Sequence, residues 1–281
     1  MSSEGSEKVH SCRAESLGKH SLIREKDENL GRYLDIYSAK SEVKGQDGGV
    51  VTALLQKGFH DGLFDAAVVV RRISGYNAEV FVAQNPEEAL ATKGTCYQKV
   101  NVTKKLRELI KTGKKRVAIV CTPCEARVAR RIQQSIGKEY DVTIIGLFCF
   151  EAFDPNRLKA EVKARLDIDL DNAEKIQIRN GEFLITVNGK EYRCRVKDLD
   201  DAVEKSCRFC SDFTSKAADI SVGSVGSKIG YSTVIVRSKK GEKLHSKNLL
   251  TRGAVAKEEV VRVAELKKRR YERSIEKLKQ H

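Results

Sequence analysis

Three short, mostly apolar runs recur along the chain. Each predicts a buried strand, because it lacks the alternation of a half-exposed strand. They are 66–70 (AAVVV), 116–121 (RVAIVC) and 141–148 (DVTIIGLF). Apolar residues at helical spacing lie between and after these runs, at 50–59, 102–111, 125–136 and 156–166. Strands that alternate with helices predict an α/β core, and further strands are expected at 33–39 and 233–237.

A different pattern occupies residues 170–200. Its alternating segments are separated by Asn180-Gly181 and by Asn188-Gly189. Asn-Gly between alternating runs is the strongest local signal of a hairpin. The pattern therefore predicts a three-stranded antiparallel β-meander, inserted into the α/β domain.

The chain divides into three predicted parts. These are a flexible N-terminal arm at 1–28, a domain at 29–255 that contains the meander, and a charged C-terminal helix at 256–281. The arm mixes Ser, Gly, Lys and Glu without periodicity. The fold class is α/β (α+β), with a mixed sheet core, flanking helices, the inserted antiparallel meander and the C-terminal helix.

The charge balance predicts an anionic partner. The 281 residues carry 53 Lys and Arg against 39 Asp and Glu, a net charge of +14. Nucleic acid or a small molecule with phosphates and carboxylates would suit this charge. The absence of Trp and the 6% aromatic content leave few platforms for stacking single-stranded nucleic acid. No signal-peptide core or membrane-length apolar run is present, so a reducing, cytoplasmic location is expected.

Eight cysteines in a reducing compartment are more typical of metal ligands than of disulfides. Cys121/Cys124 and Cys207/Cys210 form two C-x-x-C pairs, and Cys149 stands between the pairs. Two predicted strands end at a cysteine, at the sheet edge where α/β proteins bind ligands. All-thiolate coordination suits zinc or an iron–sulfur cluster. The position beside glycine-rich loops favours the cluster. The remaining cysteines are predicted to be ordinary thiols: Cys12, Cys96 and Cys194.

Two glycine-rich segments are candidates for contacting an organic cofactor. Residues 44–49 lead into a helix, and a glycine-rich turn at a helix N-terminus suits a phosphate group. The alternative interpretation is an ordinary helix capped by Asp47. Residues 223–232 alternate small and hydroxyl side chains, which permits close approach of the backbone. Neither segment is the G-x-G-x-x-G fingerprint of a dinucleotide fold.

Six segments in order resemble the beta subunit of coenzyme F420-reducing hydrogenase and its relatives. They are GQDGGVVTALL (45–55), GTCY (94–97), TPC (122–124), CFE (149–151), CRFCSDF (207–213) and ADISVGSVGSKIGYSTVIVR (218–237). The resemblance implies a subunit that holds FAD and one [4Fe-4S] cluster in the 29–255 domain. It also implies an F420-dependent oxidoreductase that exchanges a hydride with coenzyme F420. The implied partners are iron–sulfur or hydrogenase/dehydrogenase-type electron-transfer subunits, in a larger cytoplasmic complex, with no nucleic acid and no membrane span.

The resemblance also implies roles for individual residues. It places Cys124, Cys149, Cys207 and Cys210 at the cluster-ligand positions and leaves Cys121 without one. The implied flavin-binding residues are Gly45, Gln46, Asp47, Gly48, Gly49, Thr52, Gly94, Thr95, Tyr97, Asp219, Gly223, Ser224, Gly226, Ser227 and Ser232. No catalytic side chain is expected, since FAD itself would accept the hydride.

Two other functions fit parts of the sequence. One is a flavoprotein of the same fold that uses ferredoxin or another donor in place of F420. The other is a zinc-stabilised, basic nucleic-acid-binding protein. For the flavin loops, we expect valine at Gly49 or Gly226 to lower FAD occupancy with the fold intact, because a β-branched side chain would enter the cofactor's space.

Overall fold

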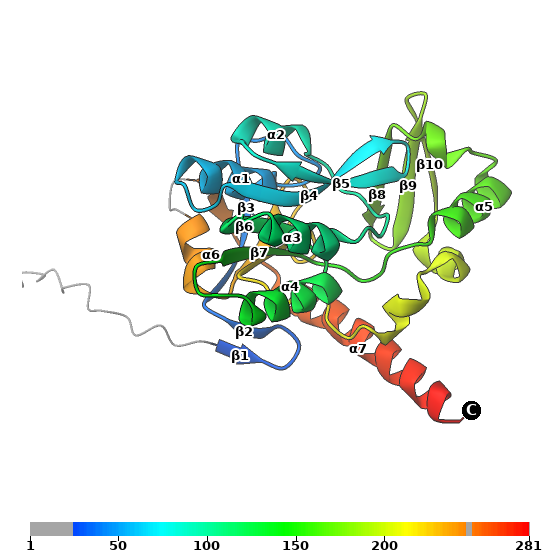
Figure 1. Cartoon of the computed structure of the whole chain (residues 1–281). Helices are drawn as coiled ribbons and strands as arrows, with labels where there is room; N and C mark the ends of the chain where they lie inside the picture. Colours follow the sequence, from blue (N-terminus) through cyan, green and yellow to red (C-terminus); the bar gives the residue numbers. More distant parts are fainter. Residues whose placement is uncertain (1–24, 246–248, 281) are drawn as a thin grey trace, which may run out of the picture.

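The computed structural model describes residues 25–245 and 249–280, and a mixed eight-stranded sheet forms its core (Figure 1). The strand order is β13-β3-β12-β11-β7-β6-β4-β5. Five of these strands point the same way: β3 (Asp35–Lys40), β4 (Ala66–Ser74), β6 (Arg116–Cys121), β7 (Asp141–Leu147) and β11 (Ile220–Gly223). The other three are antiparallel to them: β5 (Asn77–Ala83), β12 (Ser232–Val236) and β13 (Thr251–Gly253). The predicted α/β class with a mixed sheet is confirmed.

Helices cover both faces of this sheet. One apolar core joins the sheet to α1 (Val50–His60), α2 (Pro86–Ala91) and α6 (Lys239–Leu244). Cores on the opposite face join it to α3 (Val102–Lys111), α4 (Pro123–Ser135) and α7 (Lys257–Lys279). In β6, Ala118 and Val120 belong to the first core, while Val117 and Ile119 belong to the second. Both faces of the strand are therefore buried, which explains its continuous apolar run.

The meander forms a separate lobe between β7 and β11 (Figure 1). It consists of β8 (Lys175–Arg179), β9 (Glu182–Val187) and β10 (Lys190–Arg195), packed with α5 (Pro155–Leu166) around its own apolar core. Both Asn-Gly pairs have positive φ at both residues, as a two-residue hairpin turn requires. The predicted antiparallel meander is confirmed. The short 3-10 turn η1 (Leu170–Asn172) joins α5 to β8, and two further 3-10 turns lead from β10 back to the sheet: η2 (Val196–Ala202) and η3 (Lys205–Phe209).

The structure describes only the last residues of the predicted N-terminal arm. A hairpin of β1 (Glu25–Asp27) and β2 (Gly31–Tyr33) includes the last residues of the predicted arm. The other arm residues, 1–24, lie outside the described part of the chain. The predicted C-terminal helix is present as α7, which extends away from the sheet (Figure 1).

A buried arginine connects the hairpin to the sheet. Arg237 donates to the carbonyl oxygens of Leu30 at 2.8 Å and Thr214 at 2.9 Å, and to the Ser221 hydroxyl at 2.7 Å. Burial lowers the pKa of Arg237 to about 10, so the guanidinium remains charged at neutral pH. These bonds fix the segment that follows Cys210, and so help to place that cysteine.

Candidate functional site

The predicted site segments converge on one edge of the sheet. The parallel strands β3, β6, β7 and β11 end there, and the antiparallel β12 begins there. The loops that follow or precede these ends are 41–49, 122–124, 148–152 and 224–231. Ligands of α/β proteins bind at such a carboxyl edge, so this edge is the candidate site.

Four cysteines meet at this edge. Burial raises the pKa of Cys149 to about 12, and the neighbouring Cys207, Cys124 and Cys210 raise it further, while Lys267 opposes the shift. Burial likewise raises the pKa of Cys207, with a contribution from Cys124. Charges influence each other in this way only over short distances. The four thiols that the family resemblance implied as ligands therefore form one group.

Cys121 does not belong to this group. It is 3% exposed and lies in the apolar core beneath α3 and α4. Burial raises its pKa well above the ordinary value, and Glu125 and the adjacent Cys124 raise it further, but the Cys121 side chain belongs to this apolar core. In β6 it continues the alternation that places Ile119 on the same face. Cys121, to which the resemblance assigns no ligand position, is therefore a core residue.

Local bonds hold the cysteine-bearing loops together. The Cys149 amide donates to the Phe213 carbonyl at 3.0 Å, which joins the end of β7 to the segment after Cys210. The Ala152 amide donates to the Cys207 sulfur at 3.4 Å. Hydrogen bonds to ligand sulfurs are one of the factors that set the potential of an iron–sulfur cluster.

A single metal ion and an iron–sulfur cluster require different spacings of their ligands. Within residues 25–245 and 249–280, no three His, Cys, Asp or Glu side chains are grouped tightly enough to hold a single metal ion. A four-iron cluster is a larger body than one ion, and its four cysteine sulfurs stand farther apart. Four thiols from three chain segments fit the all-cysteine ligation of such a cluster.

The 45–49 turn is shaped by close packing against β3 and β12. The Gly48 amide donates to the Ser232 hydroxyl at 3.2 Å, and a Cβ at Gly48 would lie 2.5 Å from the Ala39 carbonyl oxygen. Gly49 has φ of 65° and is the N-cap of α1, without a side-chain cap. The alternative interpretation that Asp47 caps this helix is therefore wrong. α1 begins at Val50, directly after the loop that follows β3, and has the buried Thr52 in its first turn, so the N-terminus of the helix lies at the same edge.

Gln46 joins this turn to the 94–97 segment. Its side-chain amide donates to the Tyr97 hydroxyl at 3.2 Å, and its carbonyl oxygen accepts from the Thr95 amide at 3.3 Å. The Tyr97 hydroxyl also accepts from the Ile178 amide of β8 at 3.0 Å. Hydrogen bonds of Gln46 and Tyr97 therefore connect two predicted flavin-binding segments, 45–49 and 94–97, with the meander. Gly94 lies beside them, and a Cβ there would meet nothing within 4 Å.

Asp47 adds a second connection to the meander. Its carboxylate lies 3.7 Å from the Arg179 guanidinium of β8. Burial raises the pKa of Asp47, and Arg179 and Lys175 oppose that shift. The meander therefore contributes positive charge to the candidate site, which the sequence pattern did not indicate.

The 223–227 loop faces the same edge but is largely occupied by protein contacts. A Cβ at Gly223 would lie 2.2 Å from the Phe148 ring. The Ser227 hydroxyl lies 2.8 Å from that of Thr233, whereas Ser224 is exposed. Gly226, at φ of 86°, packs so closely on α7 that a Cβ would lie 2.6 Å from Val260.

The expectation that valine at Gly49 or Gly226 leaves the fold intact is therefore wrong. A Cβ at Gly49 would lie 1.9 Å from the Val43 carbonyl oxygen, and Gly226 would clash with Val260. Both residues also have positive φ, which β-branched side chains avoid. If either variant lost FAD, the cause could be a blocked cofactor contact or a changed backbone, and the experiment would not distinguish the two.

Asp219 lies away from the other predicted flavin residues. It immediately precedes β11, at the opposite edge of the sheet. Its carboxylate is 2% exposed and accepts from the Arg130 guanidinium at 2.8 Å, the Ile144 amide at 2.9 Å and the Ser238 hydroxyl at 2.8 Å. These bonds give it a structural role, so we leave it out of the candidate site.

Basic residues near the thiols were not indicated by the sequence. Lys99 donates to the Ser206 hydroxyl at 2.6 Å and lowers the pKa of Cys207. Lys267 and Arg270, both on α7, donate to backbone oxygens of the cysteine-bearing loops. In a chain with 53 basic residues, no local pattern distinguishes these three.

The fold and this edge define an α/β protein with a thiol-lined site between glycine-rich loops. Two sequence profiles match the chain: the coenzyme F420 hydrogenase/dehydrogenase beta subunit N-term over residues 36–107, and the C terminus of the same subunit over residues 114–262. The chain belongs to this family of coenzyme F420 hydrogenase and dehydrogenase beta subunits.

Individual relatives agree with the family. The coenzyme F420-dependent sulfite reductase of Methanocaldococcus jannaschii is 34% identical over 290 residues, which cover 96% of this chain but 44% of that protein. The coenzyme F420 hydrogenase subunit beta of Methanococcus voltae is 34% identical over 76% of this chain and 80% of its own length. A chain of the F420-reducing [NiFe] hydrogenase complex of Methanosarcina barkeri superposes with a TM-score of 0.84 and 26% identity, covering 90% of this chain and 94% of that one.

Proposed function

We propose that this chain is an iron–sulfur flavoprotein subunit. It exchanges a hydride between coenzyme F420 and FAD, and passes single electrons through a [4Fe-4S] cluster to partner subunits. The observation that carries the proposal is the grouping of four thiols beside the glycine-rich loops of one sheet edge. The relatives named as coenzyme F420 hydrogenase subunits support the choice of substrate and of hydrogenase-type partners.

The thiols supply the ligands for the cluster. Cys124 comes from the first turn of α4, Cys149 from the loop after β7, and Cys207 and Cys210 from η3 and its end. Because burial raises the pKa of Cys149 to about 12, iron must displace protons from the thiol form at neutral pH. Burial also raises the pKa of Cys207, and Lys267 and Lys99 oppose that shift, which favours the thiolate form that binds iron.

The loops supply the place for the flavin. The first-turn amides of α1 suit a phosphate of FAD, and the closely packed turn at Gly48 brings backbone rather than side chains to the surface. When bound, FAD supplies the conversion between a two-electron hydride and single electrons. The protein's part is to hold the reacting rings next to the cluster and to keep the two polar loops joined through Gln46.

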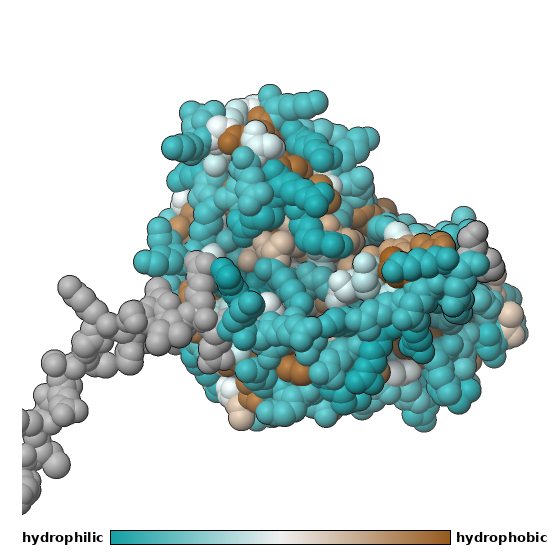
Figure 2. All heavy atoms as spheres, turned by 90° about the horizontal axis from the view of Figure 1, so that it is seen from below, coloured by the Kyte–Doolittle hydropathy of each residue, from teal (hydrophilic) through white to brown (hydrophobic). Residues whose placement is uncertain are grey.

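Positive charge at this edge suits the anionic tail of F420. The ammonium groups of Lys40 and Lys228 both lie over the Tyr231 ring, 5.4 and 4.5 Å from its centroid, and Arg179 lies beside Asp47. Hydrophilic residues also dominate the face of the molecule drawn in Figure 2. Among the helices of residues 25–245 and 249–280, none is long and apolar enough to cross a membrane.

Anaerobic purification tests the proposal directly. We expect the protein to carry one FAD, four iron and four sulfide per chain, and to show flavin and cluster absorption in the visible spectrum. A zinc-stabilised nucleic-acid-binding protein would be colourless and would contain zinc. A protein with both cofactors that reacts with reduced ferredoxin but not with F420 would instead support the same-fold alternative.

A second prediction concerns the flavin loops. Gln46→Leu removes the bonds to Tyr97 and Thr95 at nearly constant volume. Each such bond contributes about 1 kcal/mol to stability, so the fold should persist while the two loops separate. We expect FAD occupancy to fall several-fold, measured by flavin fluorescence after denaturation, with iron content unchanged. Gln134→Leu, on the exposed end of α4, is the matched control. Full FAD occupancy in Gln46→Leu would remove the 45–49 turn from the flavin site.

A further inference from the structure

A lysine of α7 is buried against the thiol group. The Lys267 side chain is 2% exposed, and its ammonium donates to the Cys149 carbonyl oxygen. None of the ion pairs among the described residues involves Lys267. Burying an ammonium group costs several kcal/mol unless a negative charge is near. The Glu151 carboxylate on the same loop pairs with Arg270, and the Lys267 ammonium is held by the backbone of a residue whose thiol is a proposed cluster ligand.

Arg270 lies one turn further along the same helix face. It pairs with Glu151, donates to the Phe150 carbonyl at 2.9 Å and to the Cys207 carbonyl at 3.5 Å, and lies 4.4 Å from the Phe150 ring centroid. One side chain therefore contacts both segments that bear Cys149 and Cys207. Arg270 therefore fixes the distance between these two segments, while the Lys267 side chain extends from α7 to the segment that bears Cys149.

The helix pattern shows why this lysine is buried. Val260, Ala264 and Lys267 occupy positions i, i+4 and i+7 of α7 and face inward together. An apolar residue would satisfy the third position if only packing were needed. The profile matches of the family end at residue 262, so Lys267 and Arg270 lie outside the part of the chain that those profiles describe.

We infer that Lys267 is the counter-cation of the cluster and raises its reduction potential, with Arg270 as the positioning residue for the two cysteine-bearing loops. The inference rests on the proposed function. Reduction adds one electron and no proton to the cluster, so the reduced form carries one more negative charge. A fixed cation beside it stabilises that form. A more positive potential would favour transfer of electrons from reduced flavin to the cluster.

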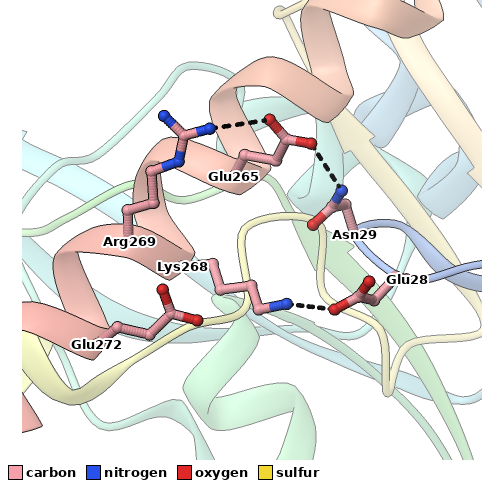
Figure 3. A pocket seen from close by; sticks show the side chains of 6 residues that line it. All are labelled: Glu28, Asn29, Glu265, Lys268, Arg269 and Glu272. Carbon is pink, nitrogen blue, oxygen red and sulfur yellow. Dashed lines mark hydrogen bonds and ion pairs between the residues drawn. The ribbon is translucent and has the colours of Figure 1, made fainter.

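The test uses the full chain with its cluster, titrated with dithionite and followed by EPR. Lys267→Met removes the charge at similar volume, Lys267→Gln keeps a hydrogen-bond donor, and Lys267→Arg keeps the charge. Lys268→Met is the matched control, because Lys268 lies on the outer face and pairs with Glu28 of the hairpin loop (Figure 3). Lys268 and Glu28 line a shallow, charged surface pocket there, together with Asn29, Glu265, Arg269 and Glu272.

We expect both neutral variants to shift the reduction equilibrium at least tenfold toward the oxidised form. This corresponds to about 59 mV for a one-electron couple. Lys267→Arg and Lys268→Met should keep the wild-type potential. Loss of iron from the neutral variants alone, with Lys267→Arg fully loaded and all variants folded by circular dichroism, would also support the counter-cation role.

Three outcomes would overturn the inference. The first is unchanged potentials in loaded neutral variants. The second is an equal shift in Lys268→Met. The third is unfolding of the neutral variants without their iron, which would mean that the fold itself needs the lysine. Wild-type protein that contains no iron or sulfide would refute the proposed function instead, so the two failures are distinguishable.

Discussion

Replacing Cys149 by Ser is expected to remove iron and acid-labile sulfide from the anaerobically purified protein. Burial and the three other thiols of the group raise the pKa of Cys149, so its sulfur lies within the group. A hydroxyl does not ionise at neutral pH and is a poor iron ligand, and a cluster with three cysteine ligands is easily lost. The same loss is expected for Cys124→Ser, Cys207→Ser and Cys210→Ser, measured as iron per chain.

Two cysteines outside the proposed ligand set, Cys121 and Cys194, provide controls for this experiment. Cys194→Ser, on the half-buried β10 strand of the meander, should keep full iron content. At Cys121 the control is Cys121→Ala, because a serine there would bury an unpaired hydroxyl in the core. Iron retained in Cys149→Ser, or lost from Cys121→Ala with the fold intact, would mean that the ligand set is different.

Much of the sheet was predictable because buried strands carry a strong local signal. The runs at 66–70, 116–121 and 141–148 correspond to β4, β6 and β7. By contrast, β5 had no predicted counterpart. Its residues, Asn77–Ala83, are mostly half-buried at the edge of the sheet, so neither a continuous apolar run nor a clean alternation marks them. The second half of β4 pairs with β5 alone, so its last four residues, from Arg71 to Ser74, are exposed.

The candidate site was predictable where its residues stand next to a strand end. Cys149 follows a buried run directly, whereas Cys121 and Cys124 were distinguished only by the family resemblance; in the structure Cys121 ends β6 in the core and Cys124 lies in the first turn of α4. Contacts made across the fold were not predictable. Arg179 reaches the site from the meander, and Lys267 reaches it from a helix more than a hundred residues after Cys149. The residues next to Arg179 and Lys267 in the sequence form no pattern that predicts these contacts.

The last prediction concerns the substrate. The protein should oxidise F420H2 at least tenfold faster than NADH or NADPH, assayed anaerobically by deazaflavin absorbance with a viologen dye as acceptor. The glycine-rich turn after β3 is G-Q-D-G-G rather than G-x-G-x-x-G, so the third glycine of the dinucleotide fingerprint, which permits close packing of helix on strand, is missing. Turnover of NADH equal to that of F420H2 would show that the proposed substrate is wrong.

Salt separates the electrostatic part of this prediction from the chemical part. The phosphate and glutamate tail of F420 would be attracted by Lys40, Lys228 and Arg179 at the candidate edge. At about 0.1 M salt the Debye length is about 10 Å, so attraction between exposed charges weakens as salt rises further. The KM for F420H2 should therefore increase with salt. A deazaflavin without the tail should show a higher KM that hardly changes with salt, since its ring chemistry is the same. If both compounds respond equally to salt, the basic residues do not bind the tail, although F420 could still be the substrate.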